Sequence, residues 1–69
     1  MTKRMRGGPA LLRAARLERA QSRATAAYLL DVHPSMVLQL EGGAKRPGLQ
    51  LALRIADIYG VPPAAWVRA

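Results

Sequence analysis

The chain of 69 residues has no cysteine and only one histidine, His33. It therefore cannot form disulfides, thiolate metal sites or a cysteine nucleophile, and one histidine is too few for a histidine-based metal site. No apolar run approaches the roughly 20 residues that a membrane-spanning helix requires. The basic N-terminus is not followed by the hydrophobic stretch of a secretory signal. We therefore expect an intracellular, cytoplasmic protein without metal, cofactor or membrane attachment.

Acidic residues are also scarce. Four Asp and Glu stand against 11 Lys and Arg, which gives a formal charge of +7. Such a high positive charge on a small chain favours a polyanionic partner, either nucleic acid or an anionic membrane surface. The arginines are spread along the sequence rather than gathered on one helical face, which argues against a membrane-surface helix. The length allows one domain with a small core, so we expect a partner subunit or ligand to stabilise it.

Two short helices that meet at a tight turn are predicted between Ser22 and Glu41. Small or apolar residues recur at helical spacing on one face of each helix: Ala26, Ala27 and Leu30, then Val37 and Leu40. Asp31 lies where the pattern breaks, and its short polar side chain tolerates the left-handed conformation that a turn needs. Pro34 suits the first position of the next helix, where its missing N–H is no loss.

The flanking segments complete an all-α fold of about five short helices. We expect a flexible basic arm over residues 1–8 and one domain over residues 9–69. A first helix is predicted from Pro9 to about Arg19, a fourth over residues 49–59, and a final helical turn around Trp66. The predicted inward residues are Leu12, Ala15, Arg16 and Leu17 in the first helix, and Leu49, Ala52, Leu53, Ala56 and Tyr59 in the fourth.

This arrangement resembles the helix-turn-helix domain of the phage-repressor type, the Cro-like or XRE family, from about Leu12 to Val67. The family's small residue falls on Ala27 and its turn glycine on Asp31. Residues 41–47, Glu-Gly-Gly-Ala-Lys-Arg-Pro, are similar to its acidic-glycine-basic-proline loop, and Ile-Ala-Asp-Ile-Tyr-Gly-Val at 55–61 to the end of its fourth helix. The resemblance implies a lambda-repressor-like fold and DNA binding. It also implies a structural ion pair between Arg16 and Glu41.

The outer face of the third helix is the candidate base-reading surface, because in this family that face enters the major groove. Four residues remain there once the inward ones are removed: Pro34, Ser35, Leu38 and Gln39. Gln39 can pair with N6 and N7 of adenine, Ser35 can donate or accept, and Leu38 can meet a thymine methyl.

Phosphate binding is predicted around this helix. Ser22 is a suitable N-cap for the second helix, and the free N–H groups of a helix start beside an arginine favour an anion. The candidates are Ser22, Arg23, His33, Lys45 and Arg46, with Lys3, Arg4 and Arg6 as a DNA arm. The alternatives are a capped surface helix, a solvated loop and a solvated tail.

The sequence favours a small repressor that binds double-stranded DNA as a homodimer on a two-fold-symmetric operator. Leu38 and Met36 make the third helix unusually apolar, so the alternative is a protein-interaction module, such as an antitoxin or adaptor, with a protein partner. Trp66 and Val61 are candidate dimer contacts, although a lone tryptophan also suits a core. An enzyme is disfavoured, because no carboxylate pair or phosphate loop is present.

Overall fold

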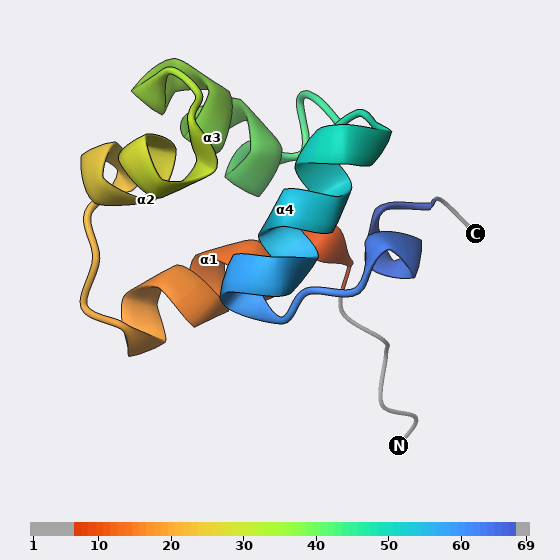
Figure 1. Cartoon of the computed structure of the whole chain (residues 1–69), viewed down its shortest axis with the longest axis horizontal. Coiled ribbons are helices and arrows are strands. Elements are labelled where there is room, and N and C mark those ends of the chain that lie inside the picture. Colours follow the sequence, from red (N-terminus) through yellow and green to blue (C-terminus); the bar gives the residue numbers. More distant parts are fainter. Residues whose placement is uncertain (1–6, 68–69) are drawn as a thin grey trace.

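The computed structural model describes residues 7–67, which form four α-helices and one short 3-10 helix (Figure 1). The elements are α1 (Gly8–Glu18), α2 (Arg23–Leu30), α3 (Pro34–Gly42), α4 (Leu49–Tyr59) and the 3-10 helix η1 (Pro63–Trp66). The all-α class agrees with the sequence, but the expected fifth helix is a single 3-10 turn. It begins at a proline and ends at Val67, where the backbone is already extended, so no α-helix develops.

The helices surround one small core. Helix α3 packs against α2 and α1, while α4 packs against α1, α2 and η1. In Figure 1, α2 and α3 lie together on one side, and α4 lies next to η1 on the other. The largest fully buried side chains come from all four helices: Leu12, Leu30, Leu40, Ile55 and Val37.

Local chemistry sets the boundaries of α2 and α3. The Ser22 hydroxyl accepts a hydrogen bond from the Thr25 backbone N–H, at 3.0 Å, and so caps α2. Asp31 ends α2 in the left-handed conformation, with φ 60° and ψ 47°, as its place in the turn predicted. Pro34 begins α3, and Gly43 ends that helix at φ 81°. These features fix the turn between the two helices.

Three predicted core residues are exposed. Leu17 is half-exposed, and Leu49 and Leu53 have exposed fractions of 73% and 51%. The apolar residues of α4 are numerous enough to fit two helical stripes, and the predicted inward set combined residues of both. The stripe that faces α1 and α2 contains Ala52 and Tyr59, as predicted, together with Ile55, which the prediction left out. These three residues lie at spacings of three and four.

The start of α1 is also displaced from the expected boundary. Gly8, assigned to the arm, is the first residue of α1 and is buried, because the Trp66 indole ring covers it. Val61 and Trp66 are both buried in the core of the single chain. Their side chains are therefore not exposed anchors for a second subunit, which corrects that prediction.

Candidate nucleic-acid interface

The outer face of α3 carries the predicted base-reading residues. Val37 and Leu40 point into the core and are fully buried. Pro34, Ser35 and Leu38 are exposed, and Gln39 is partly buried. The structure therefore presents three of the four candidates to solvent, with Gln39 at the edge of that face.

The start of α3 is capped by His33. Its Nδ1 accepts a hydrogen bond from the Ser35 backbone N–H at 3.1 Å and lies 3.0 Å from the Ser35 hydroxyl oxygen. An accepting Nδ1 places the proton of the neutral ring on Nε2. The Nε2–H is thus the donor that His33 has left for a further partner.

The loop after α3 is held against that helix by backbone hydrogen bonds. The N–H groups of Ala44 and Lys45 both donate to the Gln39 carbonyl, at 2.9 and 3.3 Å. Lys45 and Arg46 are exposed. This folding-back places the two predicted loop cations beside the C-terminal end of α3.

Arg23 reaches the same end of α3 from the start of α2. Its Nε lies 3.4 Å from a carboxylate oxygen of Glu41. Ser22, its neighbour, uses its hydroxyl to accept from the Thr25 backbone N–H and to donate to the Thr25 hydroxyl, at 3.1 Å. In the free protein Ser22 is therefore occupied by capping, and a phosphate would have to share that hydroxyl.

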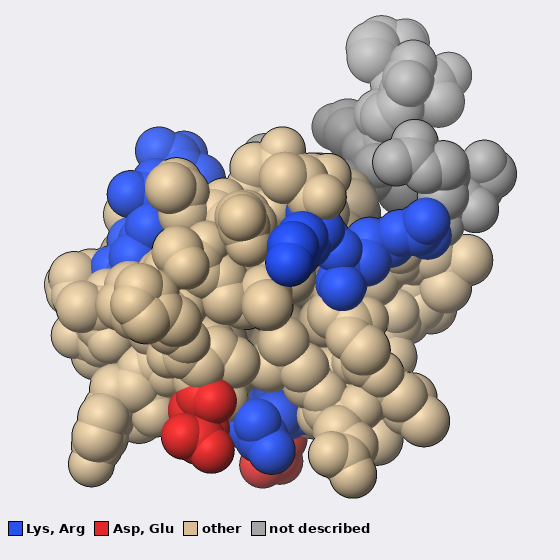
Figure 2. Space-filling view, turned by 90° about the horizontal axis from the view of Figure 1, so that it is seen from above, with Lys and Arg blue, Asp and Glu red and all other residues tan. Residues whose placement is uncertain are grey.

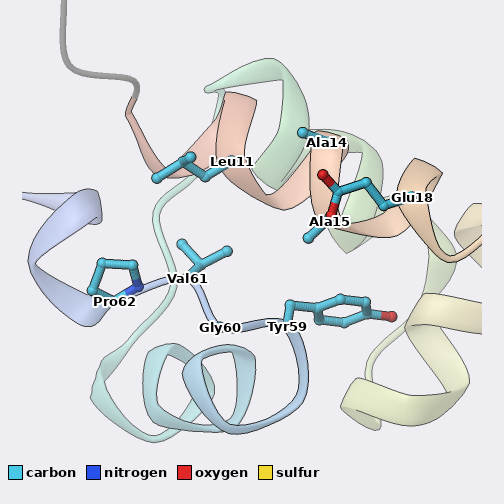
Figure 3. A pocket seen from close by; sticks show the side chains of 8 residues that line it. All are labelled: Leu11, Ala14, Ala15, Glu18, Tyr59, Gly60, Val61 and Pro62. Atoms are coloured by element: carbon cyan, nitrogen blue, oxygen red, sulfur yellow. The ribbon is translucent and has the colours of Figure 1, made fainter.

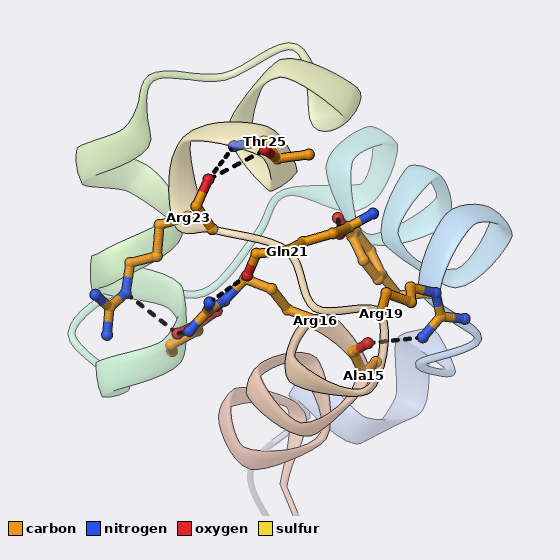
Figure 4. A network of polar contacts seen from close by, with 9 residues as sticks. Ala15, Arg16, Arg19, Gln21, Arg23 and Thr25 are labelled. Atoms are coloured by element: carbon orange, nitrogen blue, oxygen red, sulfur yellow. Dashed lines mark hydrogen bonds and ion pairs between the residues drawn. The ribbon is translucent and has the colours of Figure 1, made fainter.

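Glu41 also forms the ion pair expected with Arg16. Arg16 donates from Nε and Nη2 to the two carboxylate oxygens at 2.6 and 3.0 Å, and from Nη1 to the Gln21 carbonyl at 2.8 Å. The hydrogen bond to Glu41 raises the pKa of Arg16 above its ordinary value, against the opposing effect of burial. Figure 4 shows this network joining α1, α2 and α3.

Two further arginines are used inside the fold, which the sequence did not reveal. Arg54 of α4 donates to the Leu30 carbonyl at the end of α2, at 2.9 Å. Arg19 donates to the Ala15 carbonyl at 2.8 Å, and its guanidinium lies 5.3 Å from the centre of the Tyr59 ring. An arginine four residues from its carbonyl partner, as Arg19 is, could have been suspected from spacing. Arg54 could not, because its partner lies on another helix.

The charges are unevenly distributed. Figure 2 looks down on the side that carries α3 and shows Lys and Arg atoms in separate groups, one of which lies between two groups of Asp and Glu atoms at one edge. The predicted arm residues Lys3, Arg4 and Arg6 lie outside the described residues. The candidate interface therefore consists of the outer face of α3, His33 at its start, and Arg23, Lys45 and Arg46 near its end.

Two shallow hollows lie away from the exposed face of α3. One of about 220 Å³ lies between α1 and the end of α4, with Leu11, Glu18, Tyr59 and Val61 among its lining residues (Figure 3). The other, about 470 Å³, lies between the start of α4 and η1. Neither brings together side chains for catalysis.

No group of three or more His, Asp and Glu side chains in residues 7–67 could hold a metal ion. Within the same range, no helix has the length and apolar character needed to cross a membrane.

Comparison with known proteins agrees with this geometry. A family model described as a helix-turn-helix domain matches residues 10–66, which is most of the chain. Searches of curated proteins and of solved structures found no significant match. The matched range contains α2, the turn at Asp31 and α3, together with the helices that support them. The chain belongs to the helix-turn-helix domain family.

Proposed function

We propose that the protein is a sequence-preferring DNA-binding regulator, a small repressor that binds a two-fold-symmetric operator as a homodimer in the cytoplasm. The observation that carries this proposal is the outer face of α3, exposed and bordered by phosphate-binding groups at both ends. His33 lies at one end, and Arg23 and Lys45 lie at the other. A helix in the major groove needs this arrangement, because phosphates flank the groove on both sides.

Base reading is assigned to Ser35, Leu38 and Gln39, with Pro34 beside them. Gln39 supplies the one bidentate polar contact, which suits adenine, while Leu38 suits the methyl group of thymine. The net charge of +7 supplies affinity for any duplex. Lys3, Arg4 and Arg6 are proposed to add to that affinity.

A dimer contact is proposed at the start of α4. Leu49 and Leu53 are one helical turn apart and exposed, and Leu49 lines the hollow of about 470 Å³ together with the exposed Val67. This apolar surface replaces Val61 and Trp66 as the candidate, because those two side chains are buried. A two-fold dimer through such a surface would present two α3 helices to half-sites about one helical turn apart.

Selection from a randomised duplex pool, repeated over a salt series, tests the proposal. We expect a two-fold-symmetric motif, and an affinity that falls linearly in log salt. Selection without any sequence motif but with the same salt dependence would reduce the function to backbone binding. Absence of binding at low salt would overturn the proposal.

The second candidate function is a protein-interaction module such as an antitoxin or adaptor. It is favoured by the exposed apolar side chains on the two helices of the motif, since Leu38 on α3 is 53% exposed and Tyr28 on α2 is 85% exposed. Exposed apolar side chains that form a contiguous patch are typical of protein contacts. If Leu38→Ser abolishes capture of a protein partner while duplex binding is absent in the unchanged chain, this alternative replaces DNA binding.

A further inference from the structure

The carboxylate of Glu41 lies at the junction of three helices. It belongs to α3, and it accepts hydrogen bonds from Arg16 of α1 and Arg23 of α2. Its side chain is only 3% exposed, while that of Arg23 is 44% exposed. One buried acid therefore contacts one buried and one half-exposed arginine.

The two arginines have different roles at this carboxylate. Arg16 occupies both oxygens in a bidentate pair, and its remaining terminal nitrogen donates to the Gln21 carbonyl. It therefore neutralises Glu41 and has little capacity left for other partners. Arg23 approaches through Nε alone, at 3.4 Å, to the oxygen that Arg16 already contacts through Nη2.

This geometry leaves the charge of Arg23 available. Two guanidinium groups and one carboxylate leave one net positive charge, which lies on the more exposed partner. Among the nitrogens of Arg23, Nε is the one that contacts Glu41 in the described structure, and Figure 4 shows no interaction drawn from the two terminal nitrogens. A guanidinium held through Nε keeps the two terminal NH₂ groups, and these can bind a phosphate.

We propose that Glu41 is a positioning residue for DNA binding, which holds Arg23 through Nε so that its terminal NH₂ groups meet a backbone phosphate. This inference rests on the proposed function. The Arg16–Glu41 pair fixes the carboxylate, and the carboxylate restricts the rotamers of Arg23 before DNA arrives. Restricting a long side chain in advance lowers the entropy lost on binding.

Arg23→Lys tests the proposal at an exposed position. Lysine keeps the charge but has no Nε donor and no second terminal NH₂ group. Binding to the selected duplex is measured by fluorescence anisotropy over a salt series, with Arg13→Lys on the exposed side of α1 as the matched control. We expect the Kd of Arg23→Lys to rise about three- to tenfold with an unchanged salt slope, and that of Arg13→Lys to change less than about twofold.

The role of Glu41 is separated from that of Arg23 by a double-mutant cycle. In a Glu41→Gln background the Nε tether is weakened, so we expect Arg23→Lys to raise Kd less than about twofold. Equal losses in the two backgrounds would overturn the proposal. Circular dichroism establishes that Glu41→Gln is folded before its Kd is used.

NMR of the unchanged free protein tests whether Glu41 holds Arg23 through Nε, even if Glu41→Gln does not fold. The Nε–H of Arg23 should exchange with water more slowly than the Nε–H of Arg13, because within residues 7–67 only the former has a carboxylate partner. Equal exchange rates would overturn the proposal. Failure of the unchanged chain to bind duplex would overturn the proposed function, whereas binding that Arg23→Lys leaves intact would overturn only the positioning role.

Discussion

The indole ring of Trp66 lies directly on the Cα atom of Gly8, which joins η1 to the first turn of α1. A Cβ atom added at Gly8 would lie 2.4 Å from Cδ2 and from Cε3 of Trp66. No side chain fits at such distances, so glycine is required here by the close approach of the ring. The contact holds η1 against Gly8, the first residue of α1, which the sequence analysis placed in the arm.

We expect Gly8→Ala to lower the free energy of unfolding by about 1–3 kcal/mol, since the added methyl group must displace a packed indole. Gly42→Ala is the matched control, because Gly42 lies at the end of α3 with no atom within 4 Å of an added Cβ. That change should be neutral or stabilise by up to about 1 kcal/mol. Urea unfolding followed by circular dichroism measures both, and equal effects would show that the indole can move away at no cost.

Ala20, between α1 and α2, has a left-handed backbone conformation with φ 53°. Side chains with a Cβ atom lose about 1–2 kcal/mol in this conformation, and glycine does not. We expect Ala20→Gly to raise the midpoint of thermal unfolding, although the added flexibility of the unfolded chain offsets part of the gain. Ala24→Gly, at an exposed site within α2, should lower the midpoint of thermal unfolding. A lower midpoint in both variants would contradict backbone strain at Ala20.

Arg16 and Glu41 form a buried ion pair, and loss of Arg16 leaves the buried Glu41 carboxylate with only the 3.4 Å contact from Arg23. We expect Arg16→Met to destabilise the domain by up to about 3–5 kcal/mol, which is a large part of the roughly 5–15 kcal/mol typical of a whole domain. The double variant Arg16→Met, Glu41→Leu should recover much of this loss, because no charge then remains buried. The midpoints of chemical denaturation measure the stability of both variants. A double variant as unstable as Arg16→Met would show that the loss comes from packing and not from the buried charge.

Tyr59 should make the protein sensitive to alkaline pH. Burial raises the pKa of the Tyr59 hydroxyl, with a partial opposing effect from the Arg19 guanidinium. The folded state therefore holds this proton more tightly than the unfolded chain, whose tyrosine pKa is about 10. Its contribution to stability is complete below about pH 10 and is lost as pH rises through the higher folded-state pKa.

Tyr59→Phe should show a smaller loss of stability above about pH 10 than the unchanged chain. Its stability at neutral pH should be lower by about 1 kcal/mol, because the hydroxyl donates a 2.6 Å hydrogen bond to the Gln21 side chain. Tyr28→Phe is the control, since Tyr28 is exposed. Thermal unfolding is measured across the alkaline pH range. The dependence of stability on pH should be parallel for Tyr28→Phe and the unchanged chain.

Gln39 is expected to read sequence rather than charge. Gln39→Ala should weaken the selected duplex by about 1–3 kcal/mol and leave random duplex nearly unaffected. Arg46→Ala should weaken both alike and reduce the salt slope by about one. Competition titrations measure the two effects; equal losses of specific and random binding in Gln39→Ala would remove it from the base-reading set.

The sequence predicted the features that depend on neighbouring residues. Ser22 caps α2 through its hydroxyl, and Asp31 and Pro34 act through their own backbone conformation, so the cap, the left-handed turn and the start of α3 follow from residue type and spacing. The resemblance to a known family supplied the longer connection between Arg16 and Glu41.

Contacts between helices could not be predicted in the same way. The stripe of α4 that includes Ile55 is buried only because of how α4 meets α1 and α2, and its own pattern fits Leu49 and Leu53 equally well. The bond from Arg54 to the Leu30 carbonyl and the contact of Arg23 with Glu41 depend on that same packing. Such contacts follow from the relative placement of helices, which local periodicity does not contain.

The contact between Gly8 and Trp66 also has a consequence for the order of folding. It joins residues 58 positions apart, since 66 minus 8 is 58, whereas α2, the turn and α3 lie within about 20 consecutive residues. Closing a long loop has a larger entropic cost than closing a short one, and distant contacts slow folding. We therefore expect α2 and α3 to pack together before Trp66 of η1 packs on Gly8 of α1. Fluorescence of the single tryptophan would then report the last step of folding.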